Sequence, residues 1–260
     1  MKVATSTAII PVHESNDATA IPQAKPKTFH PTKRRHGMIF DIETGPLPDD
    51  QLHSLYIEPT YEEFAANCDS RWKEETKREK FEQSKATVWD RFVERAALDA
   101  TTGQILAIGY LHTEDGSTET FDVSDGLFTE KRLIKAFWNS CQSCGEQHSI
   151  IGHNIHGFDL PFLIRRSFIL DVGIPAGVLE NGRWFSQQFV DLMRVWACGV
   201  SGNSFVGLDR LARVFGIGAK NGDGAKFAEL LANNPPDARE YLKNDLILTA
   251  EVARRLNIVA

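Results

Sequence analysis

The spacing of hydrophobic residues changes repeatedly along the chain between a period of two and a period of three to four. Such changes predict strands that alternate with helices. The predicted strands are 38–44, 104–111, 118–123, 149–154 and a strand or strand–helix junction at 189–196. The predicted helices are 69–97, one from 129 past Cys141, one from 159, then 208–215, 226–232 and a last one that starts after Pro235-Pro236 and runs to about 256.

The order of these elements predicts a mixed sheet with helices on its faces, because the first three strands follow one another and the later strands alternate with helices. Residues 49–99 interrupt this succession and are predicted to form a helical insertion. We therefore expect one domain over residues 37–260 that contains this insertion.

Residues 1–36 differ from the rest in composition and charge. They contain four prolines, show no sustained hydrophobic period, and are predicted to form a disordered basic tail. Six basic and two acidic residues give this tail a charge of +4, which leaves −10 on residues 37–260 of a chain whose net charge is −6. The tail is either a solvated extension or an electrostatic tether to nucleic acid or to a partner.

The charge balance and the cysteine content also limit the class of protein. With 29 basic and 35 acidic residues, the chain is not expected to coat duplex nucleic acid by charge alone. Four sparse cysteines and no long apolar run predict a cytoplasmic protein. Cys141, Cys144 and His148 have the spacing of half a zinc site, although a short helix end is the simpler interpretation.

The first predicted strand carries two carboxylates on one face. Alternate strand residues point the same way, so Asp41 and Glu43 lie together while Phe40 and Ile42 pack on the other side. Adjacent negative charges repel one another, and a divalent cation would relieve this repulsion. Taken alone, the pattern is also typical of an exposed strand face.

Two further acidic motifs follow. Asp159 comes after a predicted strand and a glycine turn, at the sheet edge where ligands collect; it could also serve only as a helix N-cap. Tyr241 and Asp245 are four residues apart on the last predicted helix and therefore share a face. Such a pair is also common on helix surfaces.

Taken together, the three motifs resemble the DEDD superfamily of 3′-5′ exonucleases. The matching segments are Asp41-Ile42-Glu43-Thr44, Asn154 with Phe158-Asp159, and Tyr241-x-x-x-Asp245. They are similar, more narrowly, to the proofreading exonuclease domain of family B DNA polymerases and to stand-alone predicted exonucleases related to it. The tyrosine branch (DEDDy) fits, because the histidine of the other branch would stand where Glu240 is found. The resemblance covers about residues 38–256.

This resemblance implies a ribonuclease H-like α/β fold, with a five-stranded mixed sheet and helices on both faces. It also implies metal-dependent hydrolysis of phosphodiester bonds by two cations, Mg²⁺ or Mn²⁺. Asp41, Glu43 and Asp245 would hold one ion, and Asp41 would bridge to a second ion supported by Asp159. Tyr241 would orient the attacking water.

The resemblance further implies that Thr44, Asn154 and Phe158 contact the 3′-terminal nucleotide. Single-stranded DNA is the favoured substrate, and an RNA-trimming exonuclease or a non-catalytic module that binds nucleic-acid ends are the alternatives. A polymerase or repair proteins are candidate partners. Asp191 either supports the site through hydrogen bonds or is purely structural.

Overall fold

The computed structural model describes residues 36–145, 148–180, 184–200 and 204–260, which belong to one compact unit. Its strands are β1 (Gly37–Pro46), β2 (Gly103–His112), β3 (Thr118–Asp122), β4 (Ser149–Gly152), β5 (Leu179–Glu180), β6 (Trp184–Phe185) and β7 (Phe189–Asp191). Its helices are α1 (Asp49–Leu55), α2 (Tyr61–Ala66), α3 (Glu74–Ala96), α4 (Glu130–Ser143), α5 (Asp159–Ile169), α6 (Leu192–Trp196), α7 (Leu208–Phe215), α8 (Phe227–Asn233) and α9 (Pro235–Arg255), with a 3-10 turn η1 (Gly224–Lys226). The predicted tail lies outside the described residues except for His36.

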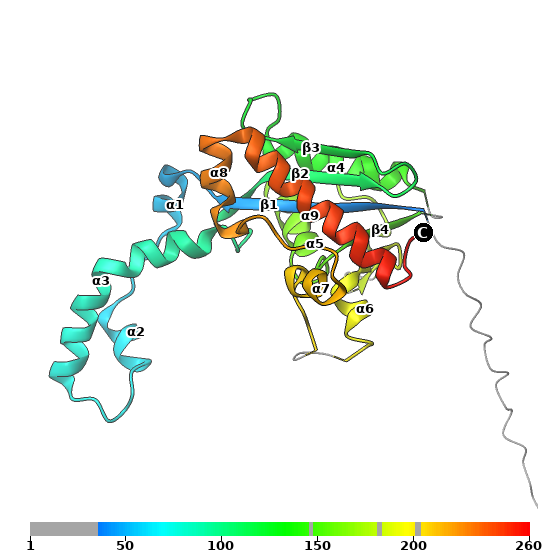
Figure 1. The fold of residues 1–260 in the computed structure, drawn as a ribbon. Coiled ribbons are helices and arrows are strands. Elements are labelled where there is room, and N and C mark those ends of the chain that lie inside the picture. Colours follow the sequence, from blue (N-terminus) through cyan, green and yellow to red (C-terminus); the bar gives the residue numbers. More distant parts are fainter. Residues whose placement is uncertain (1–35, 146–147, 181–183, 201–203) are drawn as a thin grey trace, which may run out of the picture. The chain divides into compact units, whose positions relative to one another are not determined.

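Five strands form the central sheet in the order β3-β2-β1-β4-β7. β1 and β2 pair antiparallel, as do β2 and β3, whereas β4 pairs parallel with both β1 and β7. The predicted five-stranded mixed sheet is therefore confirmed. β1 is its central strand, so the residues of β1 can meet helices on either face (Figure 1).

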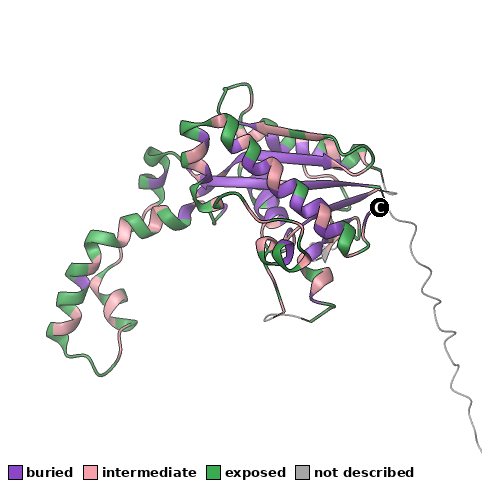
Figure 2. Ribbon diagram, viewed as in Figure 1, coloured by how far each residue is buried: buried purple, intermediate pink, exposed green. Residues whose placement is uncertain are grey.

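The alternation of side chains along β1 divides the core into two layers. Met38, Phe40 and Ile42 pack against α4 and α5 in one apolar cluster. Ile39 lies on the opposite face, in a cluster with α7 and α9, and α8 completes that side through Phe227. Figure 1 shows α9 running across β1 and β2, and Figure 2 shows both strands buried. Helices thus cover both faces, as predicted.

The region between β1 and β2 contains three helices, of which the sequence predicted only the longest. The prediction of a helix over 69–97 agrees with α3, which begins five residues later because Lys73 has extended backbone angles. α1 and α2 are short, and α2 begins with a capping box between Thr60 and Glu63 that the prediction overlooked. Leu47, Leu52 and the end of α3 form a separate small apolar cluster.

Two other local differences concern short elements. Residues 189–196 divide into a three-residue strand and a five-residue helix, joined at Asp191, which caps α6 by accepting a hydrogen bond from the Met193 N–H. The small hairpin β5–β6 was not predicted, because two-residue strands carry too little sequence pattern to be detected. In the described parts of the chain, every helix is too short or too polar to cross a lipid bilayer.

Candidate functional site

Three carboxylates from distant parts of the chain meet on the α9 face of the sheet. Asp41, Glu43 and Asp245 each offer an oxygen, and these oxygens lie within 4.8 Å of one another. Glu43 and Asp245 are buried, whereas Asp41 is partly exposed. No other group of three acidic, histidine or cysteine side chains in the described ranges converges in this way.

The backbone explains why these side chains meet. Asp41 and Glu43 are alternate residues of β1 and project from the same face. A shift of register between Glu43 and Thr44 then changes the pairing with β2 at the end of this acidic segment. Tyr241 and Asp245 are one helical turn apart on the buried face of α9, as predicted from their spacing.

Asp159 lies beside this group but outside the tight cluster. It is the first residue of α5, and Phe158 occupies the N-cap position, so the interpretation of Asp159 as an N-cap is wrong. Its carboxylate accepts a weak hydrogen bond of 3.4 Å from the Ile42 backbone N–H, which places it against β1. Its negative charge also raises the pKa of Asp41, as expected for neighbouring carboxylates.

Asp191 organises the loop that carries Asn154. Its two carboxylate oxygens accept hydrogen bonds from the N–H groups of Asn154 (2.9 Å), His156 (3.0 Å) and Met193 (3.0 Å). Asn154 has a positive φ of 66°, which a non-glycine residue adopts only when its surroundings hold it there. Of the two interpretations of Asp191, the structure therefore favours support of the loop before Asp159.

Lys220 is the residue that the sequence analysis missed. Its ammonium lies 2.6 Å from Asp245 Oδ2 and donates a 3.3 Å hydrogen bond to the Tyr241 hydroxyl. The Lys220 backbone N–H is held by Asp209, which in turn accepts from Arg213. The only available signal was a single lysine in a glycine-rich segment, and such segments are common in loops of every kind.

Glycines bring the Lys220 loop close to the site. A Cβ atom at Gly222 would lie 2.8 Å from the Tyr241 ring, so a side chain there would push the loop away. At Gly224 it would lie 3.5 Å from the Tyr241 hydroxyl and 3.7 Å from Glu43 Oε2. The loop therefore covers Tyr241 and Glu43 closely.

The titration of the four carboxyl groups reflects their burial. Burial raises the pKa of Asp41 well above its usual range, and the charge of Asp159 raises it further. Burial and then the charge of Asp245 raise the pKa of Glu43 to about 8. Burial also raises the pKa of Asp159, to about 7, and that of Asp245, which the Lys220 ammonium opposes. The group therefore requires protons or cations at neutral pH.

Tyr241 has an environment that keeps its phenol protonated. The side chain is almost fully buried and packs against Phe227 at a ring-centroid distance of 6.0 Å. Burial raises the pKa of the phenol, and the nearby charges of Glu43 and Asp245 raise it further. This group can orient a neighbour by hydrogen bonding, but it is a poor base at neutral pH.

The three residues predicted to contact a substrate follow or precede the predicted metal ligands in sequence, and they differ in availability. The Thr44 hydroxyl donates a 2.7 Å hydrogen bond to the Ala97 carbonyl and is therefore already engaged. Phe158 is partly exposed and packs against Phe162. The Asn154 side chain folds over Gly157, where a Cβ atom would lie 2.4 Å from Asn154 Oδ1. Their roles stay predictions.

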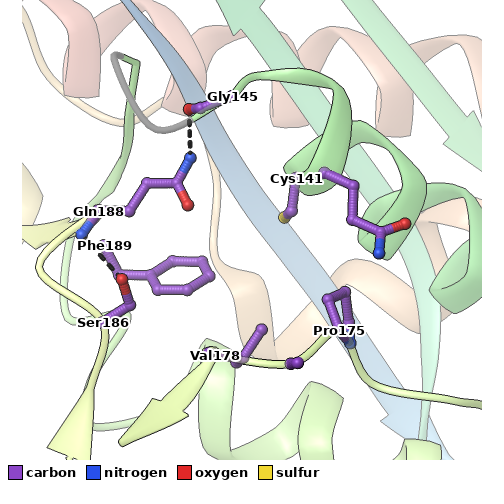
Figure 3. A pocket seen from close by; sticks show the side chains of 10 residues that line it. Cys141, Gly145, Pro175, Val178, Ser186, Gln188 and Phe189 are labelled. Carbon is purple, nitrogen blue, oxygen red and sulfur yellow. Dashed lines mark hydrogen bonds between the residues drawn. The ribbon is translucent and has the colours of Figure 1, made fainter.

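The cysteine pattern and the cavities lie apart from this group. Cys141 lines a cavity of about 250 Å³ between the end of α4 and Phe189, in which Gln188 donates a hydrogen bond to the Gly145 carbonyl (Figure 3). Cys144 lines a different cavity, together with His148. The two thiols thus border separate spaces, and none of the four acidic residues lines either one.

Comparison with known proteins gives a family and a fold. Residues 97–259 match the family described as "Predicted 3'-5' exonuclease related to the exonuclease domain of PolB". The matched range includes Asp159, Tyr241 and Asp245 and begins after Asp41 and Glu43. No curated protein sequence matches the chain.

The structure of the family B DNA polymerase from the hyperthermophilic archaeon Pyrobaculum calidifontis is similar, with a TM-score of 0.53 and 20% identity. The match covers 86% of this chain and 25% of the polymerase, so the chain spans about a quarter of that protein's length. The predicted ribonuclease H-like fold is thereby confirmed.

Proposed function

Because the chain belongs to the family of predicted 3′-5′ exonucleases related to the exonuclease domain of PolB, we propose that it removes nucleotides from single-stranded 3′ ends with two divalent cations. DNA is the favoured substrate. The observation that carries this proposal is the convergence of Asp41, Glu43 and Asp245 within 4.8 Å, with Asp159 beside them.

The chemistry of these residues fits divalent cations. All four side chains are carboxylates, and Mg²⁺ and Mn²⁺ prefer oxygen ligands. Both carboxylate oxygens of the buried Asp245 lack a hydrogen-bond donor of good geometry, although the Lys220 ammonium lies close to one of them. A buried carboxylate without a donor requires a positive charge nearby, and the single charge of Lys220 does not neutralise all four carboxylates.

In this proposal Asp41, Glu43 and Asp245 would hold one ion, and Asp41 would share a second ion with Asp159. Bound cations would offset the negative charge of the scissile phosphate. They would also lower the pKa of a water molecule, which makes that water a better nucleophile. The raised pKa values of Glu43 and Asp159 mean that cations displace protons from the site, so activity should increase with pH.

The other side chains would orient the reacting groups. The Tyr241 phenol stays protonated, and its oxygen accepts from Lys220. Its O–H, which also lies beside the Asp245 carboxylate, would orient the water. Lys220 would stabilise negative charge next to Asp245. Thr44, Asn154 and Phe158 would contact the terminal nucleotide, and base stacking on Phe158 would not require a particular sequence.

Digestion of labelled nucleic acids tests the proposal. Single- and double-stranded DNA and RNA, labelled at the 3′ or the 5′ end, are incubated with and without Mn²⁺. We expect stepwise shortening of 5′-labelled single strands, fastest for DNA. Asp41→Ala should abolish it, whereas Asp50→Ala, an exposed change on α1, should not.

The other outcomes identify the alternatives. Faster digestion of RNA would indicate an RNA-trimming enzyme. A parent protein that binds 3′ ends but cleaves none of the substrates with Mn²⁺ would be a binding module. Cleavage by Asp41→Ala at the parent rate would refute the two-cation assignment.

A further inference from the structure

The charges of α3 are separated into two stripes. One side of the helix carries cations and hydroxyls without an acid, and another side carries five of the six acids of α3. Because residues three or four positions apart share a side, each set follows the helix axis. The donor stripe consists of Lys73, Lys77, Lys80, Ser84, Thr87, Arg91 and Arg95. The acidic stripe consists of Glu75, Glu79, Glu82, Asp90 and Glu94.

The donor stripe lies outside the packed side of α3. Tyr61 and Phe64 of α2 pack against Phe81, and α1 packs against Trp89 and Phe92. These aromatic residues occupy the side of the helix between the two stripes. Figure 2 shows α3 largely exposed along its length, so the donor stripe is accessible to a ligand.

Within the described residues, the cations of the stripe have no acidic partner. Two other basic residues of α3 form its ion pairs, Arg78 with Glu74 and Lys85 with Glu82. In the described parts of the chain, no carboxylate forms an ion pair with any of the five cations of the donor stripe. Lys80 is held only by the Trp72 ring, 4.9 Å from its ammonium. Five unpaired cations are thus available to an anionic ligand.

The stripe ends where α3 meets β1. Arg95 lies in the last turn of α3, and the Ala97 carbonyl just beyond it accepts the hydrogen bond from Thr44. Thr44 directly follows Glu43 in β1. From Arg95 back to Lys73 the stripe spans 23 residues, and the 22 steps between them correspond to about 33 Å of helix.

We propose that the donor stripe of α3 binds the phosphate backbone of a single-stranded substrate, upstream of the 3′ end that enters the site. This inference rests on the proposed function. Lys and Arg side chains are among the groups that contact phosphates, and they make up five of the seven residues of the stripe. The Ser84 and Thr87 hydroxyls already donate to the backbone carbonyls of Phe81 and Ser84. The chain as a whole has a charge of −6, so this row of cations offers a local binding path.

The number of cations sets the expected salt dependence. Each phosphate contact to a single strand contributes about 0.7 to the slope of log affinity against log salt concentration. Five contacts give a slope of about 3.5, so raising salt from 50 to 200 mM should lower affinity about 100-fold. Losing three contacts should lower the slope by about 2.

Fluorescence anisotropy with a labelled 20-nucleotide single strand in EDTA measures this slope. The stripe variant is Lys73→Gln/Lys77→Gln/Lys80→Gln. Its matched control, Arg71→Gln/Arg78→Gln/Lys85→Gln, removes the same charge from cations that have acidic partners. We expect at least a tenfold loss of affinity at 50 mM salt for the stripe variant and less than a threefold loss for the control.

Further measurements make each outcome decisive. Arg91→Gln/Arg95→Gln tests the other half of the stripe, and circular dichroism melts verify that every variant folds. Equal losses in stripe and control variants would overturn the proposal, as would a parent slope near zero. A larger loss for duplex than for single strands would overturn the choice of ligand.

Binding in EDTA does not depend on hydrolysis, so the two proposals can fail separately. A protein that cleaves no substrate yet shows the stripe-dependent slope would refute only the proposed function. An active exonuclease whose affinity for single strands is unchanged in the stripe variant would refute only the proposed role of the stripe.

Discussion

The pH dependence of stability without metal should reveal the cost of crowding four carboxylates. Glu43 has a pKa of about 8 in the folded protein and about 4.5 when unfolded. Between pH 4.5 and about pH 8, Glu43 keeps its proton in the folded protein and loses it in the unfolded chain. The contribution of Glu43 to the free energy of unfolding is therefore fully present below pH 4.5 and is lost as the pH rises through 8.

The pKa difference gives the magnitude. One pKa unit corresponds to about 1.4 kcal/mol, so Glu43 alone accounts for a decrease on the order of 5 kcal/mol. Glu43→Gln keeps the size of the side chain but cannot ionise. We expect this variant to be more stable than the parent at pH 9 in EDTA, with a smaller loss of stability between pH 5 and pH 9.

Urea denaturation in EDTA at pH 5, 7 and 9 measures these free energies of unfolding. Glu229→Gln, an exposed change on α8, is the control and should follow the parent. Added Mn²⁺ should restore the parent's stability at pH 9, because the ion binds only the folded state, and should stabilise Glu43→Gln less. Parallel pH profiles for the parent and Glu43→Gln would refute the raised pKa that burial and the Asp245 charge give to Glu43.

Three further outcomes test single residues. Tyr241→Phe should lower kcat by roughly 10- to 10³-fold, which is the range for a positioned catalytic group, while Mn²⁺ still raises the Tm. An unchanged kcat, measured where chemistry limits the rate, would exclude the phenol from the mechanism. Lys220→Met should lower the Tm of the metal-free protein more at pH 8 than at pH 5, because ionised Asp245 loses its cation. Calorimetry at the two pH values measures this difference. An equal decrease in Tm at both pH values would show that Lys220 contributes by packing alone. Asp191→Ala should speed hydrogen exchange at the Asn154 amide, measured by NMR, because that N–H loses its acceptor; unchanged exchange would show that Asp191 does not hold the loop.

Local periodicity was sufficient to predict which acidic residues share a face, whereas only the family resemblance implied that the motifs meet in one site. A period of two placed Asp41 and Glu43 on one face of β1, and a spacing of four placed Tyr241 and Asp245 on one face of α9. These relations depend only on backbone geometry, which is the same in every strand and helix. The order of the elements predicted a mixed sheet with helices on its faces, and the resemblance implied its five strands.

The rest of the site depends on contacts that no local pattern encodes. Lys220 reaches Asp245 because its loop is held by Asp209, and nothing in the sequence specifies that pairing. The register shift after Glu43 arises from pairing with β2, which lies beyond the insertion. The conformation of Asn154 likewise depends on Asp191, 37 residues away.

The close approach of α9 to β1 has its own cause in the neighbouring strand. Asp41 pairs with Gly109 of β2, and directly paired residues point to the same face. A Cβ atom at Gly109 would lie 2.8 Å from Leu246 and 2.9 Å from Leu242, which flank Asp245 on α9. Because Gly109 has no side chain, both leucines pack directly on the sheet beside Asp41. This packing brings α9 close enough for the Asp245 carboxylate to approach Asp41 and Glu43 on β1. The family match begins at residue 97, after the strand that carries Asp41 and Glu43. Their place in the cluster is thus fixed by the pairing of β1 with β2 and by the packing of α9 over Gly109.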